Sequence, residues 1–122
     1  MILIVEGDLS YGQRLRDSIH QLGEEVHLVL DGLEALRWLR NFLPKLIVVD
    51  QTAPWIDGFR LCRLIKFHKR QQQVPVLLMG MVTDEEHRRL ANAVKADGYV
   101  EKQEDLGPVM QWVRGWLAGG GK

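Results

Sequence analysis

Residues 46–59 read LIVVDQTAPWIDGF and carry the strongest fold signal in the chain. Four consecutive aliphatic residues end at an aspartate, and Pro54 and the Asp57-Gly58 pair mark the loop that follows. An unbroken apolar run of this kind is typical of a strand that is covered on both faces, and helices usually provide that cover. The stretch therefore predicts a central strand of a parallel sheet that leads directly into Asp50.

Four other short apolar runs alternate with stretches of helical periodicity. The expected strands are residues 2–5, 26–29, 46–49, 74–79 and 99–100. This alternation predicts an α/β fold with a parallel sheet, in which the first, third and fourth strands are central.

Apolar residues spaced by three and four predict five helices between and after these strands. The expected buried positions are Tyr11, Leu15, Ile19 and Leu22 in the first helix, Ala35, Leu36, Leu39 and Leu43 in the second, Phe59, Cys62 and Ile65 in the third, Leu90 and Val94 in the fourth, and Leu106, Met110, Val113 and Leu117 in the fifth. Gly23 is expected to end the first helix in a left-handed conformation. The pairs Asp31 with Glu34 and Thr83 with Glu86 predict capping boxes at the second and fourth helices.

The composition fits one globular domain. The chain has 122 residues, 46% of them hydrophobic and 26% charged, and its sixteen basic residues balance sixteen acidic ones. No net charge attracts it to nucleic acid or to an anionic membrane. Cys62 is the only cysteine, which excludes an internal disulfide and favours a cytoplasmic location. We expect a domain over residues 1–118 and a flexible glycine-rich tail, or the start of a linker, at 119–122.

Polar residues follow the predicted strands where each strand ends. Glu6 and Asp8 come after the first strand, Asp50 ends the third, Gly80 follows the fourth and Lys102 follows the fifth. The carboxyl ends of parallel strands share one edge of the sheet, so these residues are expected to meet there. Carboxylates gathered at one edge repel one another unless a lysine or a hard cation compensates their charge.

The segments ILIVEGD, LIVVDQTAPWIDGF, VPVLLMG and DGYVEK occur in this order and resemble the response-regulator receiver domains of two-component signal transduction. The resemblance implies a flavodoxin-like, doubly wound, five-stranded parallel sheet of order 2-1-3-4-5 with five helices. It implies that Asp50 accepts a phosphoryl group from a histidine kinase, a phosphotransfer protein or a small phosphodonor, and that Lys102 binds this group. A receiver is a signalling domain, whose only expected catalysis is its own phosphorylation.

The residues expected to hold Mg²⁺ depart from the receiver pattern. The family has an acidic pair after the first strand, where this chain has Glu6 and Gly7. A weakened Mg²⁺ site is therefore expected from Glu6, Asp50 and the backbone carbonyl of Thr52, with Asp8 as a further ligand only if its loop shifts. The preferred interpretation of Asp8 is a cap of the first helix. No organic cofactor is expected.

The predicted switch residues depart from the pattern as well. Gly80 stands where the family has a threonine or serine that binds the phosphoryl group, and Tyr99 holds the position of the aromatic switch residue. With no side chain at Gly80, Tyr99 is predicted to rest inward even without phosphorylation; alternatively, it only covers the sheet edge. Gln103 replaces the family's proline, so a trans Lys102–Gln103 peptide bond is predicted.

Two functions remain open from the sequence. Asp50 and Lys102 favour a phosphoacceptor that switches partner binding, whereas Gly7, Gly80 and Gln103 favour a pseudo-receiver that binds partners independently of phosphorylation.

Three tryptophans are candidates for the partner surface. Trp112 and Trp116 suit an output domain or a homodimer contact through the fourth helix, fifth strand and fifth helix, or they close the flank of the core. Trp55 either contacts a partner or folds over its own loop. We expect no nucleic-acid binding by this chain itself and no membrane contact.

Overall fold

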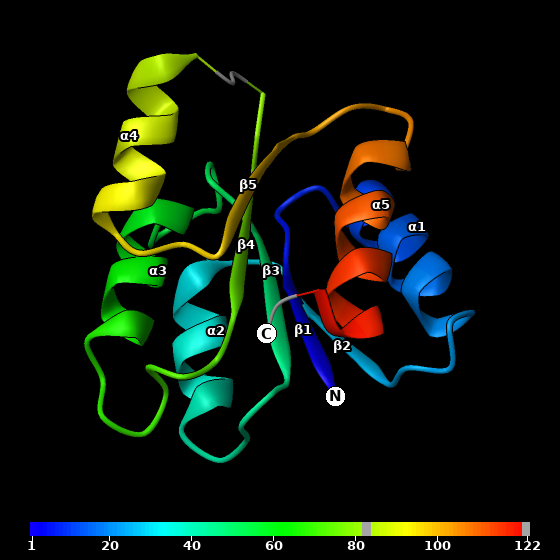
Figure 1. Ribbon diagram of the computed structural model, residues 1–122. Coiled ribbons are helices and arrows are strands. Elements are labelled where there is room, and N and C mark those ends of the chain that lie inside the picture. Colours follow the sequence, from blue (N-terminus) through cyan, green and yellow to red (C-terminus); the bar gives the residue numbers. More distant parts are fainter. Residues whose placement is uncertain (82–83, 121–122) are drawn as a thin grey trace.

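The computed structural model describes residues 1–81 and 84–120 and contains one five-stranded parallel sheet (Figure 1). The strands are β1 (Ile2–Val5), β2 (Val26–Val29), β3 (Leu46–Asp50), β4 (Val76–Gly80) and β5 (Gly98–Glu101). Their order across the sheet is β2-β1-β3-β4-β5. The predicted doubly wound fold, with β1, β3 and β4 in the centre, is confirmed.

Helices cover both faces of the sheet (Figure 1). They are α1 (Leu9–His20), α2 (Gly32–Leu39), α3 (Gly58–Lys66), α4 (Glu85–Ala93) and α5 (Gly107–Gly115), and a further helical turn, η1, spans Trp116–Gly120. Because strand side chains alternate, Val49 and Leu78 pack toward α2, α3 and α4, whereas Val48 and Met79 pack toward α1 and α5. Each face of the sheet therefore has its own hydrophobic core.

The central strands are wholly buried, as their apolar runs predicted. Every residue of β1, β3 and β4 is buried. Cys62 is also buried in the core as predicted, and burial raises the pKa of its thiol to about 12.

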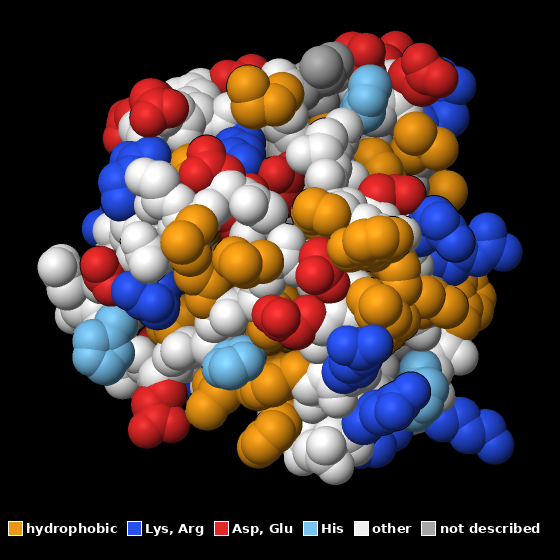
Figure 2. Space-filling view, turned by 180° about the vertical axis from the view of Figure 1, so that it is seen from behind, with side chains coloured by type: hydrophobic (Ala, Val, Ile, Leu, Met, Phe, Trp, Pro, Cys, Tyr) orange, Lys and Arg blue, Asp and Glu red, His pale blue; other side chains and the backbone are white. Residues whose placement is uncertain are grey.

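The part of the surface seen in Figure 2 carries acidic and basic side chains with hydrophobic ones between them. None of the described helices is both long and apolar enough to cross a membrane.

The observed strand boundaries correct the predicted ones by one or two residues. The fourth strand begins at Val76 rather than Val74, because the Val74 amide donates to Gln71 O in the preceding turn and Pro75 has no amide hydrogen. The third strand extends to Asp50 and the fourth to Gly80. The predicted site residues Asp50 and Gly80 are therefore the last residues of their strands and do not lie beyond them.

Three predicted core residues are instead exposed. Leu22 and Leu43 are 38% and 54% exposed because α1 and α2 end before they reach these positions. On α4, Ala91 and not Leu90 faces the core, and Leu90 is 45% exposed.

The helix caps follow the sequence signals with one change. Gly23 has a φ of 91°, as predicted for a residue just past a helix end. Asp31 accepts a hydrogen bond from the Glu34 amide at 2.7 Å, and Glu34 accepts one from the Leu30 amide at 3.2 Å. Thr83 lies outside the described residues. The residue that caps α4 is Asp84, which accepts a hydrogen bond from the His87 amide at 2.9 Å.

Gly32 gives a test of how closely the loop after β3 packs on α2. Its amide donates to Pro54 O at 3.1 Å, and a Cβ atom there would overlap the carbonyl oxygen of Ile56. We expect Gly32→Ala to lower the free energy of unfolding by about 1–3 kcal/mol. Gly115→Ala on α5 is the control, because the added Cβ atom would meet no other atom within 4 Å. This variant should leave the free energy of unfolding unchanged or raise it by up to ~1 kcal/mol. Equal urea midpoints for the two variants would contradict this packing.

Candidate functional site

Asp50 ends the central strand β3 and is held in place by the next turn of chain. It is only 5% exposed. Its Oδ1 accepts hydrogen bonds from the backbone amide and the hydroxyl of Thr52, both at 3.1 Å. Its other oxygen, Oδ2, lies 3.0 Å from Lys102 Nζ. The carboxylate is therefore fixed at the carboxyl edge of the sheet, where strand order reverses and ligands bind in folds of this kind.

Lys102 connects the ends of three strands. The Lys102 amide donates to Gly80 O at 2.8 Å, which continues the pairing of β5 with β4. Its Nζ lies 2.8 Å from Glu6 Oε1, just after β1, and 3.0 Å from Asp50 Oδ2, at the end of β3. The Tyr11 ring centroid is 4.5 Å away on α1. One ammonium group thus bridges two carboxylates at a largely buried position.

The pKa values of the three groups follow from this arrangement. Burial raises the pKa of Glu6 to about 7, and the contact with Lys102 limits the rise. Burial alone would also raise the pKa of Asp50, but the Thr52 amide and Lys102 hold it below its ordinary value. Burial would lower the pKa of Lys102, yet the two carboxylates raise it. At neutral pH the site therefore holds an ionised Asp50 beside a charged lysine, which suits a carboxylate nucleophile that attacks an anionic group.

Asp8 caps α1, in agreement with its preferred interpretation. Its Oδ1 accepts a hydrogen bond from the Tyr11 amide at 3.2 Å, and its own amide donates to Glu6 Oε2 at 3.0 Å. Within residues 1–81 and 84–120, no group of three His, Cys, Asp or Glu side chains is placed to hold a metal ion. The expected ligands Glu6 and Asp50 do come together, but Lys102 stands between them.

The Tyr99 ring points inward toward Gly80. Its hydroxyl donates to Gln51 Oε1 at 2.7 Å, and the ring centroid lies 6.2 Å from that of Phe59. A Cβ atom on Gly80 would overlap both the Tyr99 hydroxyl and Gln51 Oε1. The inward position agrees with the prediction made from Gly80, whereas a switching role for Tyr99 stays a prediction.

Gln51 belongs to this part of the site and was missed by the sequence reasoning. It directly follows Asp50, and its amide donates to Met79 O at 2.8 Å. The sequence does contain a signal, because in a parallel ladder the residue after Asp50 lies beside Gly80, where a side chain is absent.

Trp112 and Trp116 form a stacked pair at the flank of the sheet. Their ring centroids are 5.0 Å apart at an interplanar angle of 11°. A Cβ atom on Gly98 would overlap the Trp112 indole, so Trp112 packs against β5 at Gly98. The contact with Gly98 favours a packing role for Trp112, although both rings keep part of their surface exposed.

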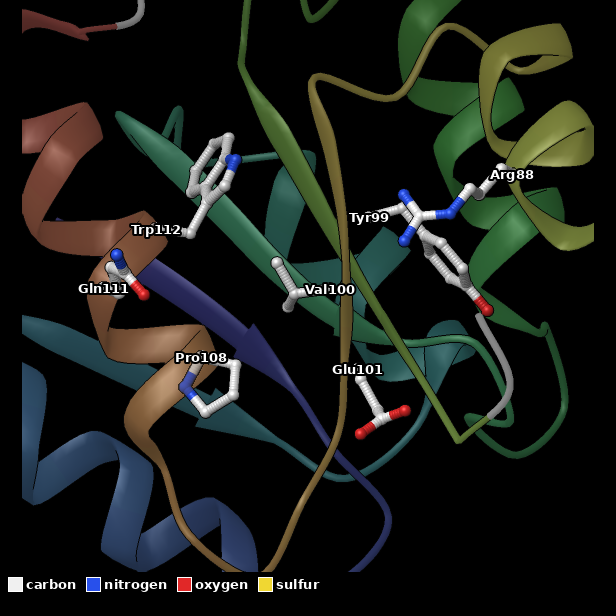
Figure 3. Close-up of a pocket in the computed structure, with 7 residues that line it drawn as sticks. All are labelled: Arg88, Tyr99, Val100, Glu101, Pro108, Gln111 and Trp112. Carbon is white, nitrogen blue, oxygen red and sulfur yellow. The ribbon is translucent and has the colours of Figure 1, made fainter. Parts of the chain in front are cut away.

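Trp112 also lines a pocket of about 510 Å³ between α4, β5 and α5. Figure 3 shows the Arg88 guanidinium beside the Tyr99 ring on one side of this pocket and Trp112 on the other. Trp55 is far more exposed, at 80%, and has a φ of 70°. Its ring therefore does not fold over the loop.

The Lys102–Gln103 peptide bond is trans, as predicted.

The raised pKa of Glu6 predicts a pH-dependent stability. The unfolded chain loses this proton near its ordinary pKa of 4.5, whereas the folded protein keeps it up to about pH 7. The free energy of unfolding should therefore fall as pH rises through this window. Glu6→Gln removes the effect, so its stability relative to the native chain should increase by roughly 2–3 kcal/mol between about pH 5 and about pH 8. Urea unfolding in the presence of a chelator measures this difference.

The exposed residue Glu86 provides the control for this measurement, since Glu86→Gln removes a carboxylate from the surface of α4. A stability difference between Glu6→Gln and the native chain that does not change with pH would contradict the raised pKa.

The comparison with known proteins identifies one family. The family described as the response regulator receiver domain matches residues 2–114. The phosphate regulon transcriptional regulatory protein PhoB of Rhizobium meliloti is 29% identical over 116 residues, covering 95% of this chain and 51% of that protein. The transcriptional regulatory protein AfsQ1 of Streptomyces coelicolor is 34% identical over 101 residues, covering 83% of this chain and 44% of that protein. The chain thus spans about half the length of these relatives.

Solved structures agree with this match. The receiver domain of a signal transduction histidine kinase from Syntrophus aciditrophicus has a TM-score of 0.86 at 29% identity, covering 97% of this chain and 89% of that one. The chemotaxis response regulator CheY4 of Vibrio cholerae shares the fold, with a TM-score of 0.86 at 23% identity over 93% of this chain and 94% of that one. The sequence match, the strand order and the position of Asp50 lead to the same conclusion: the chain belongs to the response regulator receiver domain family.

Proposed function

We propose that Asp50 accepts a phosphoryl group and that Lys102 supplies the positive charge that this transfer needs. Phosphorylation-dependent switching is the general function of receiver domains in two-component response regulators. The observation that carries the proposal is the 3.0 Å contact between Lys102 Nζ and the buried, ionised Asp50. A phosphoryl group bound to Asp50 would lie beside this ammonium group, which offsets the negative charge on its oxygens.

The transfer itself is a simple displacement. A carboxylate oxygen of Asp50 forms a bond to phosphorus while the phosphorus–nitrogen bond of a phosphohistidine or phosphoramidate donor breaks. The electron pair of that bond leaves with the nitrogen, which takes up a proton from solvent. The partner that donates the group is proposed to be a histidine kinase or a phosphotransfer protein in the cytoplasm.

Mg²⁺ binds the active sites of receiver domains in general, but the side chains of this chain do not fit an octahedral oxygen shell. Gly7 contributes no carboxylate, and a Cβ atom there would lie 3.0 Å from Pro54 Cδ. Asp8 is engaged as the helix cap, and Lys102 Nζ lies between Glu6 and Asp50. With one carboxylate missing and the gap taken by an ammonium group, we propose that Mg²⁺ binds weakly and that Lys102 acts in its place.

A pseudo-receiver is the second candidate. It is favoured by the Tyr99–Gln51 hydrogen bond, which holds the aromatic residue inward in the unmodified protein. In that case the pocket lined by Arg88, Tyr99 and Trp112 would bind its partner without phosphorylation.

In either case the proposed partner surface is the α4-β5-α5 face, through which an output domain or a second copy would bind. Trp112 and Trp116 border this face, and Trp55 offers a separate exposed contact beside the Asp50 site. Nucleic-acid binding and membrane contact are not part of the proposal for this chain, and neither is an organic cofactor or catalysis beyond its own phosphorylation.

Intact-mass analysis after incubation with phosphoramidate tests the acceptor. We expect the native chain to gain the mass of one phosphoryl group and Asp50→Asn to gain none, because the nucleophilic carboxylate is lost. Asp57→Asn is the matched control, since Asp57 caps α3 nearby and its replacement should leave the gain intact. No gain in the native chain would favour the pseudo-receiver.

Restoring the missing carboxylate should restore the metal site. We expect Gly7→Asp to raise the affinity for Mg²⁺ by at least about tenfold, measured by NMR titration, because it completes the acidic pair. Gly7→Asn places a side chain of the same size against Pro54 without adding charge, and it should leave the affinity for Mg²⁺ low. A native chain that binds Mg²⁺ as tightly as Gly7→Asp would contradict the weakened site.

A further inference from the structure

We propose that the Gln51 carboxamide replaces the hydroxyl that Gly80 lacks and donates a hydrogen bond to the phosphoryl group on Asp50. Tyr99 is the positioning residue, because its hydroxyl holds the carboxamide in place. The inference rests on the proposed acceptor function of Asp50 and assigns the second group that contacts the phosphoryl oxygens.

The space beside Gly80 is the first observation. A Cβ atom on Gly80 would overlap Gln51 Oε1 and the Tyr99 hydroxyl. The volume that a threonine or serine side chain would fill is therefore occupied by a carboxamide and a phenol. Position 80 itself carries no polar side chain, and two polar groups from other residues lie there instead.

The ladder places Gln51 next to both Asp50 and Gly80. Asp50 is opposite Met79 in the pairing of β3 with β4, and the Gln51 amide donates to Met79 O at 2.8 Å. The Gly58 amide donates to Gln51 O at 3.0 Å, so both backbone polar groups of Gln51 are held. Its side chain thus starts one residue from the phosphoacceptor and reaches across to the end of β4.

The direction of the Tyr99 hydrogen bond decides which end of the carboxamide is available. A carboxamide has one acceptor oxygen and an NH₂ group with two donor hydrogens. The Tyr99 hydroxyl donates to Oε1 at 2.7 Å, which fixes the oxygen on the Tyr99 side and leaves Nε2 as the donating end. Figure 3 shows the Tyr99 hydroxyl directed away from Trp112, at the far end of its ring.

A phosphoryl group on Asp50 would have three acceptor oxygens. The ammonium group of Lys102 is the one positive charge that the proposal places beside them. Lys102 Nζ already contacts Asp50 Oδ2 and Glu6 Oε1, so it cannot serve all of these oxygens. An N–H donor from Gln51 would supply a second hydrogen bond to the phosphoryl oxygens, beside the contact from Lys102.

The test compares initial phosphorylation rates by intact-mass analysis with phosphoramidate in excess. We expect Gln51→Ala to slow phosphorylation about 10- to 100-fold, because one donor to the developing charge is lost. Tyr99→Phe keeps the ring but frees the carboxamide, so a smaller loss of several-fold is expected. Gln103→Met is the control, since Gln103 is an exposed glutamine on the loop after β5 and its loss should not change the rate.

A rescue variant separates donation from a merely structural role. Gly80→Ser combined with Gln51→Ala and Tyr99→Ala puts a hydroxyl into the space that both side chains vacate and should recover most of the lost rate; a structural role for Gln51 would give no such recovery. If the native chain is phosphorylated and Gln51→Ala matches it, the inference about Gln51 is wrong while the acceptor function stands. If the native chain is not phosphorylated at all, both are wrong.

Discussion

The contact of Lys102 with Glu6 and Asp50 is the interaction on which the rest of the site depends. Two carboxylates approach each other at the ends of the fully buried strands β1 and β3, where their repulsion is weakly screened. The ammonium group lies within 3.0 Å of both and, together with the Thr52 amide, holds the pKa of Asp50 below its ordinary value. In a receiver with a complete acidic pair, a divalent cation shares this task. Here Gly7 provides no second carboxylate, and the Lys102 ammonium group lies between Glu6 and Asp50.

The departures from the receiver pattern are connected by packing. Pro54 lies against Gly7, and its carbonyl accepts from the Gly32 amide, so the loop after β3 sits closely on the start of α2. On the other side of Asp50, Gln51 and Tyr99 fill the volume next to Gly80. Each of these two glycines therefore has a neighbour close to the position that a Cβ atom would take.

The fold was predictable from the sequence because its signals are local. The apolar run 46–49 requires cover on both faces. Asp8 and Asp31 begin helices through their side-chain caps, and Gly23 follows a helix end in a left-handed conformation. The errors have physical causes as well: Pro75 delays β4, and helices that end early leave Leu22 and Leu43 in solvent. Gln51 was missed because its signal, a position beside Gly80, appears only when the register of β3 against β4 is considered.

A crystal structure of the unmodified protein grown with millimolar Mg²⁺ would test the central claim most directly. The account predicts that Lys102 Nζ bridges Glu6 and Asp50 with no metal between them, and that the Tyr99 hydroxyl rests on Gln51. An octahedral Mg²⁺ held by Glu6, Asp50 and the Thr52 carbonyl, with Lys102 displaced, would contradict it.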